Sequence, residues 1–256
     1  MRKFLQVLSR QQLRQSLLVH SHRPGAFRPR RRQAQASGFT RLEVLVLLVL
    51  CVVILFNQLP ALARSRDAGQ RAVCANNLKR LGFAIITYAA ENRDEFPGRV
   101  SGNPWTRQLL PYYQQTNILY CPNDSPTAAD FGAYTTNNFG PRSYFLNGFS
   151  DYLFVNELPQ KTPLPVSTIK HPKDTILFGE KRTDSGHWWM DYLDGDDLSD
   201  WERARHFNES TYPGQTGGSN HVFADGSVRF LKFGEGLSPI NFWFVVEVLR
   251  NGYTPF

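Results

Sequence analysis

A long apolar stretch and an amphipathic pattern follow one another near the start of the chain. The apolar stretch runs from Leu42 to Ala63 and contains no charged residue after Glu43. Beyond it, apolar residues recur at alternating spacings of four and three, the period of one helix face. These residues are Cys74, Leu78, Leu81, Ile85 and Tyr88. Together the two patterns predict one long helix from Phe39 to about Asn92.

The first half of this helix is long enough to cross a membrane. A bilayer core needs about 20 mostly apolar residues, and residues 42–63 supply 22. Asn57, Gln58 and Pro60 interrupt the last third of the segment, and a proline inside a helix kinks its axis. We therefore expect residues 39–63 to lie in a membrane or a filament core, and residues 64–95 to lie against a globular domain.

The sequence predicts that residues 96–256 form a separate domain, which is large enough to have a core of its own. Its patterns predict a helix over residues 105–113, a strand over 175–178, a hairpin over 221–233 and a helix over 240–250. Asp225-Gly226 suits a type I′ turn in the hairpin, and Ser238-Pro239 suits a helix start. The expected fold is α+β, with the long helix packed on a small, loop-rich antiparallel sheet.

The first 38 residues carry the excess positive charge of the chain. They hold nine basic residues and no acidic ones, so removing them changes the formal net charge from +7 to −2. A cationic block before an apolar segment stays on the cytoplasmic side of a membrane. The alternative is an RNA-binding arm around residues 28–32. We favour the membrane topology and expect no nucleic-acid partner.

Glu43 lies at the head of the apolar segment, where a charge is costly. Ionisable groups inside a membrane cost about 2.5 to 3.5 kcal/mol on insertion scales and tend to have a partner. The sequence Gly38-Phe39-Thr40-Arg41-Leu42-Glu43 and the apolar run after it resemble the class III signal of type IV pilins and type II secretion pseudopilins. Two features differ from that family: Arg41 replaces an apolar residue, and the leader is unusually long.

The resemblance implies a scheme of processing and assembly. A prepilin peptidase cuts after Gly38, Phe39 becomes the methylated N-terminus, and Glu43 pairs with the N-terminal amine of a neighbouring subunit. Residues 1–38 are then a cleaved cytoplasmic leader, and the chain is a single-pass inner-membrane protein with a periplasmic domain. The implied partners are other pilins or pseudopilins, the prepilin peptidase, the inner-membrane assembly platform and the lipid bilayer.

The same residues allow an ordinary secretory signal peptide. The small-x-small site at Ala61-Leu62-Ala63 would lead to cleavage after Ala63 and release a soluble domain that starts at Arg64. Glu43 argues against this alternative, because a signal peptide gains nothing from a carboxylate at the head of its apolar run. A minor pilin used in adhesion or DNA uptake, and an exported module that binds a glycan or a partner, are further alternatives.

Three more motifs narrow the resemblance to a group of pseudopilin-like proteins from planctomycete and verrucomicrobial bacteria. The motifs are Cys74-Ala75-Asn76-Asn77-Leu78-Lys79 with Tyr88-Ala89 downstream, Cys121-Pro122-Asn123-Asp124, and Phe223-Ala224-Asp225-Gly226-Ser227-Val228. In that group a histidine usually precedes the Asp-Gly pair by nine residues. Here His206 lies farther upstream, and residues 209–216 are interpreted as an insertion in the connecting loop.

The three cysteines differ in their sequence surroundings. Cys51 lies in the apolar run and is expected to pack as a small apolar residue. In an exported domain Cys74 and Cys121 would both face an oxidising compartment, where a bridge between them stabilises the fold by roughly 3 to 4 kcal/mol. The alternative is two buried free thiols. No Cys-x-x-Cys pair is present, so no motif supports a zinc or thioredoxin-like site.

An acidic segment is the best candidate for a ligand site. Carboxylates in a Gly-containing loop suit calcium, which takes six to eight oxygen ligands, and the resemblance implies calcium in a C-terminal loop. The spacing does not match an EF-hand, and the alternative is a solvated acidic loop. Asp225 is interpreted as a turn former. The candidate calcium ligands are Asp191, Asp194, Asp196, Asp197 and Asp200.

The sequence has only weak signals for a catalytic site, so we expect that the protein is not an enzyme. The sequence has no Gly-x-Ser-x-Gly elbow, Walker loop, His-Glu-x-x-His motif or dinucleotide fingerprint. A triad can be assembled on paper, but such residues occur by chance in most loops; its members would be His206, Ser219, His221 and Asp225. An aromatic platform for a sugar is the other possibility, although such residues more often lie in a core; its members would be His187, Trp188, Trp189 and Trp201.

Overall fold

The computed structural model of the chain describes residues 38–124, 142–192, 197–207 and 216–252. The chain divides into two compact units, residues 1–50 and residues 51–256. Helix α1 (Arg41–Glu91) runs through both units as one continuous element of 51 residues. The long helix predicted from the sequence is therefore confirmed, and it begins at Arg41 rather than at Phe39.

The second unit combines short helices with one mixed sheet. The strands have the order β3-β1-β2-β4-β5; the β1–β3 pair is parallel, and the other three pairs are antiparallel. The α+β class is confirmed, and the sheet is mixed rather than wholly antiparallel. After α1 the elements are α2 (Trp105–Gln108), α3 (Leu110–Tyr113), η1 (Thr116–Leu119), β1 (Tyr144–Asn147), α4 (Ser150–Val155), η3 (Val166–Thr168), η4 (Pro172–Asp174), β2 (Ile176–Glu180), β3 (Trp189–Met190), α5 (Asp197–Asp200), β4 (Gly218–Phe223), β5 (Val228–Lys232) and α6 (Glu247–Gly252).

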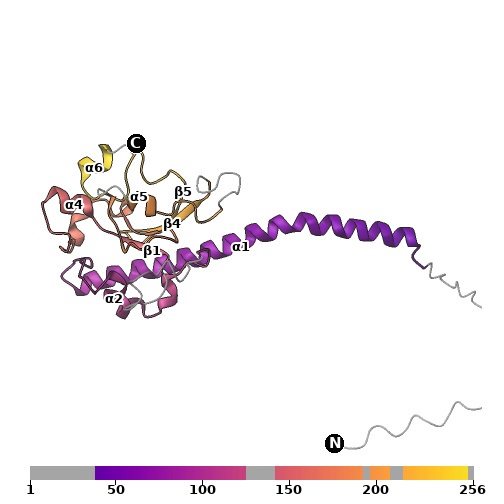
Figure 1. The fold of residues 1–256 in the computed structure, drawn as a ribbon, viewed down its shortest axis with the longest axis horizontal. Coiled ribbons are helices and arrows are strands. Elements are labelled where there is room, and N and C mark those ends of the chain that lie inside the picture. The colour runs from indigo at the N-terminus through magenta and orange to yellow at the C-terminus, as the bar shows by residue number, and fades with distance from the viewer. Residues whose placement is uncertain (1–37, 125–141, 193–196, 208–215, 253–256) are drawn as a thin grey trace, which may run out of the picture. The chain divides into compact units, whose positions relative to one another are not determined.

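The C-terminal half of α1 forms part of the domain core. Cys74, Leu78, Leu81 and Ile85 have no exposed surface, which confirms the apolar face predicted from their spacing. Figure 1 shows this part of α1 lying along the sheet beside β1 and β4. Because burying one leucine or isoleucine side chain contributes about 1.5 to 3 kcal/mol, several such contributions hold the helix to the sheet.

The two faces of the sheet pack against different segments. Side chains alternate along β1, because successive residues of a strand point to opposite faces. Tyr144 and Leu146 belong to the core that contains the α1 residues, whereas Phe145 belongs to a second core with Trp243 and Phe244. The segment before α6 therefore covers the face of the sheet opposite α1.

Gly82 lies at a close approach of α1 to the sheet. A Cβ atom there would lie 2.6 Å from the Cγ2 methyl of Val222 in β4, so Gly82→Ala is expected to lower the free energy of unfolding by about 1 to 3 kcal/mol. At Gly69, no atom lies within 4 Å of such a Cβ, and Gly69→Ala is expected to raise stability by up to about 1 kcal/mol. Urea unfolding followed by circular dichroism measures the free energy of unfolding of both variants. If both variants lose the same amount, the contact with Val222 does not explain the effect at Gly82.

The predicted hairpin is present as β4 and β5, but its turn differs from the prediction. A type I′ turn needs positive φ at both central residues, and of Asp225 and Gly226 only Gly226 has it, with φ of 80°. Gly226 N donates to Phe223 O, and Phe223 N donates to Ser227 O. The loop therefore has three residues, with the glycine in its left-handed position.

The helix predicted over residues 240–250 begins only at α6, so its predicted start was wrong. The residues before α6 cover the sheet, where Trp243 and Phe244 are buried. The Asp151 carboxylate accepts hydrogen bonds of 2.7 Å from the amides of Val245 and Val246. Contacts with distant residues therefore override the local signal for a helix start. The helix predicted over residues 105–113 is present as α2 and α3, which are separated by one residue.

Candidate functional site

The segment ahead of α1 presents the Gly38-Phe39 bond to solvent. Gly38, Phe39 and Thr40 adopt neither helix nor strand, and Phe39 is 76% exposed. Apart from its chain neighbours, no atom of the described residues lies within 4 Å of a Cβ atom placed on Gly38. Exposed segments outside regular structure are the preferred sites of proteolysis, and Gly38 to Thr40 form a segment of this kind.

Thr40 and Glu43 close the first turn of α1 reciprocally. Glu43 Oε2 accepts a hydrogen bond of 2.8 Å from Thr40 N, and Thr40 Oγ1 accepts one of 3.2 Å from Glu43 N. This arrangement is a capping box, which satisfies amides at the start of a helix. The sequence prediction missed it, although the Thr-x-x-Glu spacing is its signature. Glu43 therefore has a local partner in the uncut chain.

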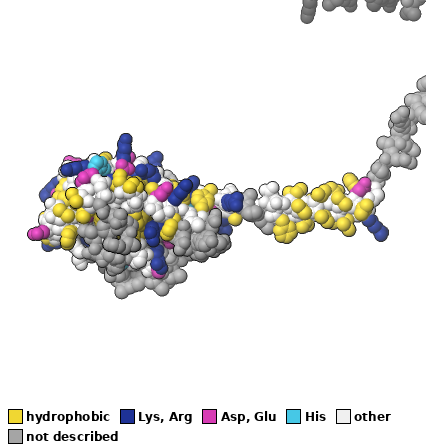
Figure 2. Space-filling model, turned by 90° about the horizontal axis from the view of Figure 1, so that it is seen from above, with side chains coloured by type: hydrophobic (Ala, Val, Ile, Leu, Met, Phe, Trp, Pro, Cys, Tyr) yellow, Lys and Arg dark blue, Asp and Glu magenta, His cyan; other side chains and the backbone are white. Residues whose placement is uncertain are grey.

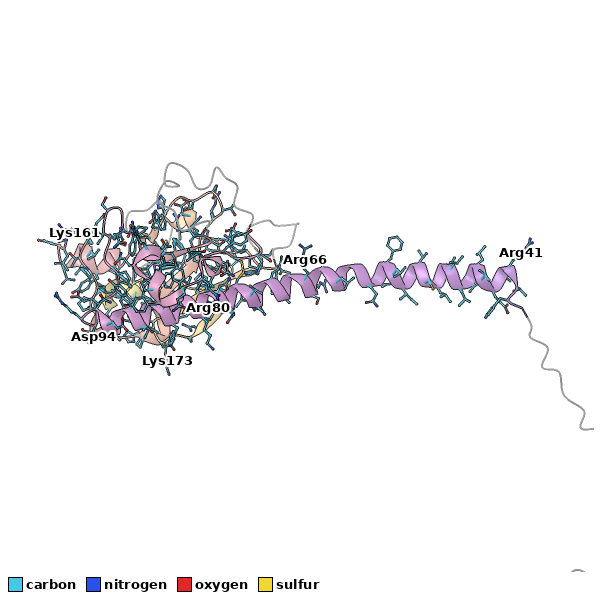
Figure 3. All side chains as sticks on the ribbon, turned by 90° about the horizontal axis from the view of Figure 1, so that it is seen from below. Arg41, Arg66, Arg80, Asp94, Lys161 and Lys173 are labelled. Carbon is cyan, nitrogen blue, oxygen red and sulfur yellow. A yellow bond between two sulfur atoms is a disulfide. The ribbon has the colours of Figure 1, made fainter. Side chains whose placement is uncertain are left out.

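An uncharged apolar surface surrounds the first half of α1. After Glu43 the next charged residue is Arg64, and the large hydrophobic side chains described from Val44 to Phe56 are exposed. Figure 2 shows hydrophobic side chains covering this part of α1, and Figure 3 places Arg41 at its start. By length and composition α1 can cross a membrane. A helix that is apolar all round is typical of a membrane span or of the core of a large protein.

A group of charged residues is buried in the second unit and is named here the buried charge cluster: Asp124, Glu180, Arg205 and His206. Arg205 Nη1 lies 2.8 Å from Asp124 Oδ1, and its Nε lies 3.6 Å from Glu180 Oε2. His206 Nε2 lies 3.0 Å from Glu180 Oε1. The side chains of Asp124, Glu180 and His206 have no exposed surface, and that of Arg205 is 4% exposed. These ion pairs are therefore shielded from water.

Arg205 stays charged inside this cluster. Burial by itself would lower the pKa of Arg205, but the carboxylates of Glu180 and Asp124 outweigh burial and raise it. Removing one partner of such a buried pair leaves an uncompensated charge. His206 and Asp124 were named in the sequence motifs, whereas Glu180 and Arg205 belong to no motif.

The Cys74–Cys121 disulfide lies beside the buried charge cluster. It joins α1 to the segment after η1 across 47 residues of sequence, so these cysteines are bridged rather than free. Cys121 Sγ lies 3.9 Å from His206 Nε2, and Cys121 N donates to Ser143 Oγ at 2.9 Å. Cys51, in the first half of α1, is a free thiol.

Part of the acidic segment gathers around His187. His187 Nδ1 contacts a carboxylate oxygen of Asp197 and lies 3.4 Å from Asp200 Oδ2. The Asp191 carboxylate does not join them but forms a salt bridge with Arg99. The other two candidate ligands, Asp194 and Asp196, lie outside the described residues. The described group is thus one histidine with two carboxylates, which differs from the oxygen ligands that calcium takes.

The residues considered for a catalytic triad have separate structural partners. Ser219 Oγ accepts a hydrogen bond from the Arg205 amide, and Asp225 Oδ1 accepts bonds from the Ser227 amide and hydroxyl, as a turn former does. His221 Nε2 accepts a hydrogen bond of 2.8 Å from Trp201 Nε1. Burial lowers the pKa of His221 to about 3, so His221 is a neutral residue of the interior.

The aromatic residues do not form one platform. Trp201 is buried in the second core. The guanidinium carbons of Arg142 and Arg99 lie over the rings of Trp188 and Trp189, at 3.5 and 5.4 Å from the ring centroids. The cavity beside Trp189 has a volume of about 10 Å³, which is room for about one water molecule. A sugar ring does not fit into this cavity.

A protein-family model matches part of the chain. The family is SBP_bac_10, described as a protein of unknown function (DUF1559), and the match covers residues 63–130. This segment contains both cysteines of the disulfide. No curated protein and no solved structure matches the chain.

Proposed function

We propose that this chain is a pseudopilin-like structural subunit of a type II secretion or type IV pilus-type filament, processed by a prepilin peptidase after Gly38. The observation that carries the proposal is the exposed Gly38-Phe39 bond directly before an apolar helix that bears a carboxylate at Glu43 and no further charge until Arg64. The resemblance of this junction to the class III signal suggests the peptidase and the partner subunits. The role is mechanical and needs no catalytic residue.

In this proposal α1 is both the anchor of the subunit and part of its core. The exposed apolar side chains of its first half suit lipid before assembly and neighbouring subunits afterwards. Its second half is held to the domain by buried side chains and by the Cys74–Cys121 bridge. The bridge therefore gives force applied to the helix a second covalent route into the domain, besides the backbone and the packing. The basic leader directs the domain across the membrane.

Processing gives Glu43 a second partner in this proposal. In the uncut chain its carboxylate caps the Thr40 amide. Cleavage after Gly38 creates an amine at Phe39, and a carboxylate in an apolar environment is stabilised by an opposite charge. The capping bond needs only an acceptor, whereas the ion pair with a neighbouring subunit needs the negative charge. The two roles can therefore be separated by mutation.

Glu43→Gln is expected to leave the subunit in the membrane but to reduce assembled oligomers by about tenfold or more, which corresponds to about 1.4 kcal/mol. Glutamine still completes a capping box, so the change removes the charge and keeps the cap. Crosslinking in cells, with the oligomer-to-subunit ratio as the readout, measures the effect. Thr40→Ala is the matched control, because it removes one bond of the cap and keeps the charge.

Equal assembly of the Glu43→Gln variant and the unaltered chain would contradict the proposed role of the charge. The alternative of an exported binding module predicts another result. In that case Glu43→Ala leaves export nearly intact, and the domain is recovered as a soluble protein that begins at Arg64. The crosslinking experiment and the location of the domain together separate the two functions.

A further inference from the structure

Four side chains with metal-ligating atoms converge beside the disulfide. Cys74, Cys121, Glu180 and His206 are all buried, and their ligand atoms lie within 4.8 Å of one another. They come from α1, the segment after η1, the end of β2 and the segment before β4. The His206 amide and carbonyl pair with Gly218 of β4. Regular structure and the sheet therefore hold the four side chains in place.

Two of these residues have unused hydrogen-bonding capacity. Among the described residues Glu180 Oε2 and His206 Nδ1 have no hydrogen-bond partner, although both atoms are buried. The Nε of Arg205 lies 3.6 Å from Glu180 Oε2, which is beyond hydrogen-bonding distance. Leaving a buried polar atom unpaired costs about 1 to 3 kcal/mol. Glu180 and His206 therefore each keep one polar atom that could interact with a further group at this site.

Two separations of the ligand atoms lie within about 0.3 Å of those in a tetrahedral zinc site. Cys121 Sγ lies 3.9 Å from His206 Nε2, which lies 3.0 Å from Glu180 Oε1. Zinc binds sulfur at about 2.3 Å and nitrogen or oxygen at about 2.0 to 2.2 Å, so neighbouring ligand atoms of such a site lie about 3.3 to 3.8 Å apart. His206 Nδ1 also lies 4.0 Å from Asp67 Oδ1, which is beyond hydrogen-bonding distance, so Asp67 does not orient the imidazole in this structure.

We propose that the reduced chain binds one zinc ion through Cys74, Cys121, His206 and Glu180. On binding, the two thiols release two protons and coordinate as thiolates. An external disulfide then oxidises them: a bond forms between the two sulfurs, the two electrons given up by the thiolates and two protons from solvent convert the external disulfide into two thiols, and the zinc ion is released. His206 and Glu180 pair with each other when the protein disulfide is closed.

Either state joins the same two segments of the chain. In an oxidising compartment the disulfide links α1 to the segment after η1. Where thiols are kept reduced, the zinc ion supplies that link. The connection between α1 and the domain is then available on both sides of the membrane. The zinc site rests on the ligand geometry and is independent of the proposed filament function, whereas its use on both sides of the membrane rests on the proposed export of the domain.

The test uses the full chain in detergent with Cys51→Ser, which leaves Cys74 and Cys121 as the remaining cysteines. The protein is reduced, freed of metal with a chelator and titrated with zinc, or with cobalt(II) as a spectroscopic substitute. We expect about one zinc ion per reduced chain and thiolate-to-cobalt charge-transfer absorption, which disappears on oxidation. That absorption separates this site from the group around His187, which contains no sulfur. A reduced chain that is folded by circular dichroism but lacks this absorption overturns the proposal.

Variants assign the remaining ligands. His206→Ala and Glu180→Gln are each expected to weaken cobalt affinity at least about tenfold. His171→Ala changes an exposed histidine that pairs with Glu247, and is expected to leave the affinity unchanged. Unchanged affinity in both ligand variants overturns the assignment. A ligand variant can fail to fold. The absorption spectrum of the reduced Cys51→Ser chain with cobalt(II) then tests the proposal by itself.

Discussion

Arg205→Met is expected to lower the free energy of unfolding by about 3 to 5 kcal/mol, the cost of breaking a buried ion pair by removing one partner. Methionine fills much of the volume of arginine but leaves Asp124 and Glu180 without this cation. Neither carboxylate side chain has any exposed surface, so water cannot replace the lost partner. Urea unfolding of the full chain in detergent at neutral pH measures the change.

Arg182→Met is the matched control for this prediction. Arg182 pairs with Asp184 at 2.6 Å, but the two side chains are 49% and 65% exposed. An exposed pair contributes about 0 to 1 kcal/mol, so this variant is expected to unfold nearly as the unaltered chain does. A loss in Arg205→Met no larger than the loss in Arg182→Met would show that the buried charge cluster is not an important contribution to stability.

Replacing both Cys74 and Cys121 by alanine is expected to cost about 4 kcal/mol. The disulfide closes a loop with a sequence separation of 47 residues, and the chain-entropy model gives about that value for a loop of this length. The same urea unfolding, carried out on the oxidised protein with a chelator present, measures the loss without interference from metal binding.

Cys51→Ala is the control for the disulfide prediction. Cys51 is a free, exposed thiol in α1, and its replacement is expected to leave the unfolding of the domain unchanged. If the double variant loses less than about 1 kcal/mol, the bridge does not restrain the unfolded chain as the entropy model requires. Packing would then be the main interaction that holds α1 against the sheet.

The long helix could be predicted from the sequence because its signal is local. The spacing of Cys74, Leu78, Leu81 and Ile85 specifies one helix face, and all four residues are buried. The sequence could not show why position 82 requires glycine, because the close contact there is with Val222, which is distant in sequence. Local periodicity thus predicts which face of a helix is buried, but not the residue that limits how closely it packs.

The start of the last helix shows the opposite case. Ser238-Pro239 is a good local signal for a helix start, yet α6 begins at Glu247. Trp243, Phe244 and Val245 in the intervening segment are buried, and Asp151 accepts hydrogen bonds from the amides of Val245 and Val246. A partner almost a hundred positions away decides this boundary, and no local pattern could reveal it.

The candidate sites also differ in whether their residues are close together or far apart in the sequence. Glu43 and Thr40 are three residues apart, and their capping box could have been predicted from the sequence. The acidic segment was recognised by its composition, but the pairing of Asp191 with Arg99 depends on a residue 92 positions away. The ligands proposed for zinc come from separate elements. They contain no Cys-x-x-Cys pair, so a motif search does not find them.

The mass and sequence of the N-terminal peptide of the mature protein, isolated from cells that make it, test the central claim most directly. Prepilin processing predicts a chain that begins at an N-methylated Phe39 and retains the whole of α1. A chain that begins at Arg64 would contradict the proposed function, because the apolar segment and Glu43 would have been removed with a signal peptide. An uncut chain that keeps the basic leader would contradict it as well, since no amine would then be available at Phe39 to pair with Glu43.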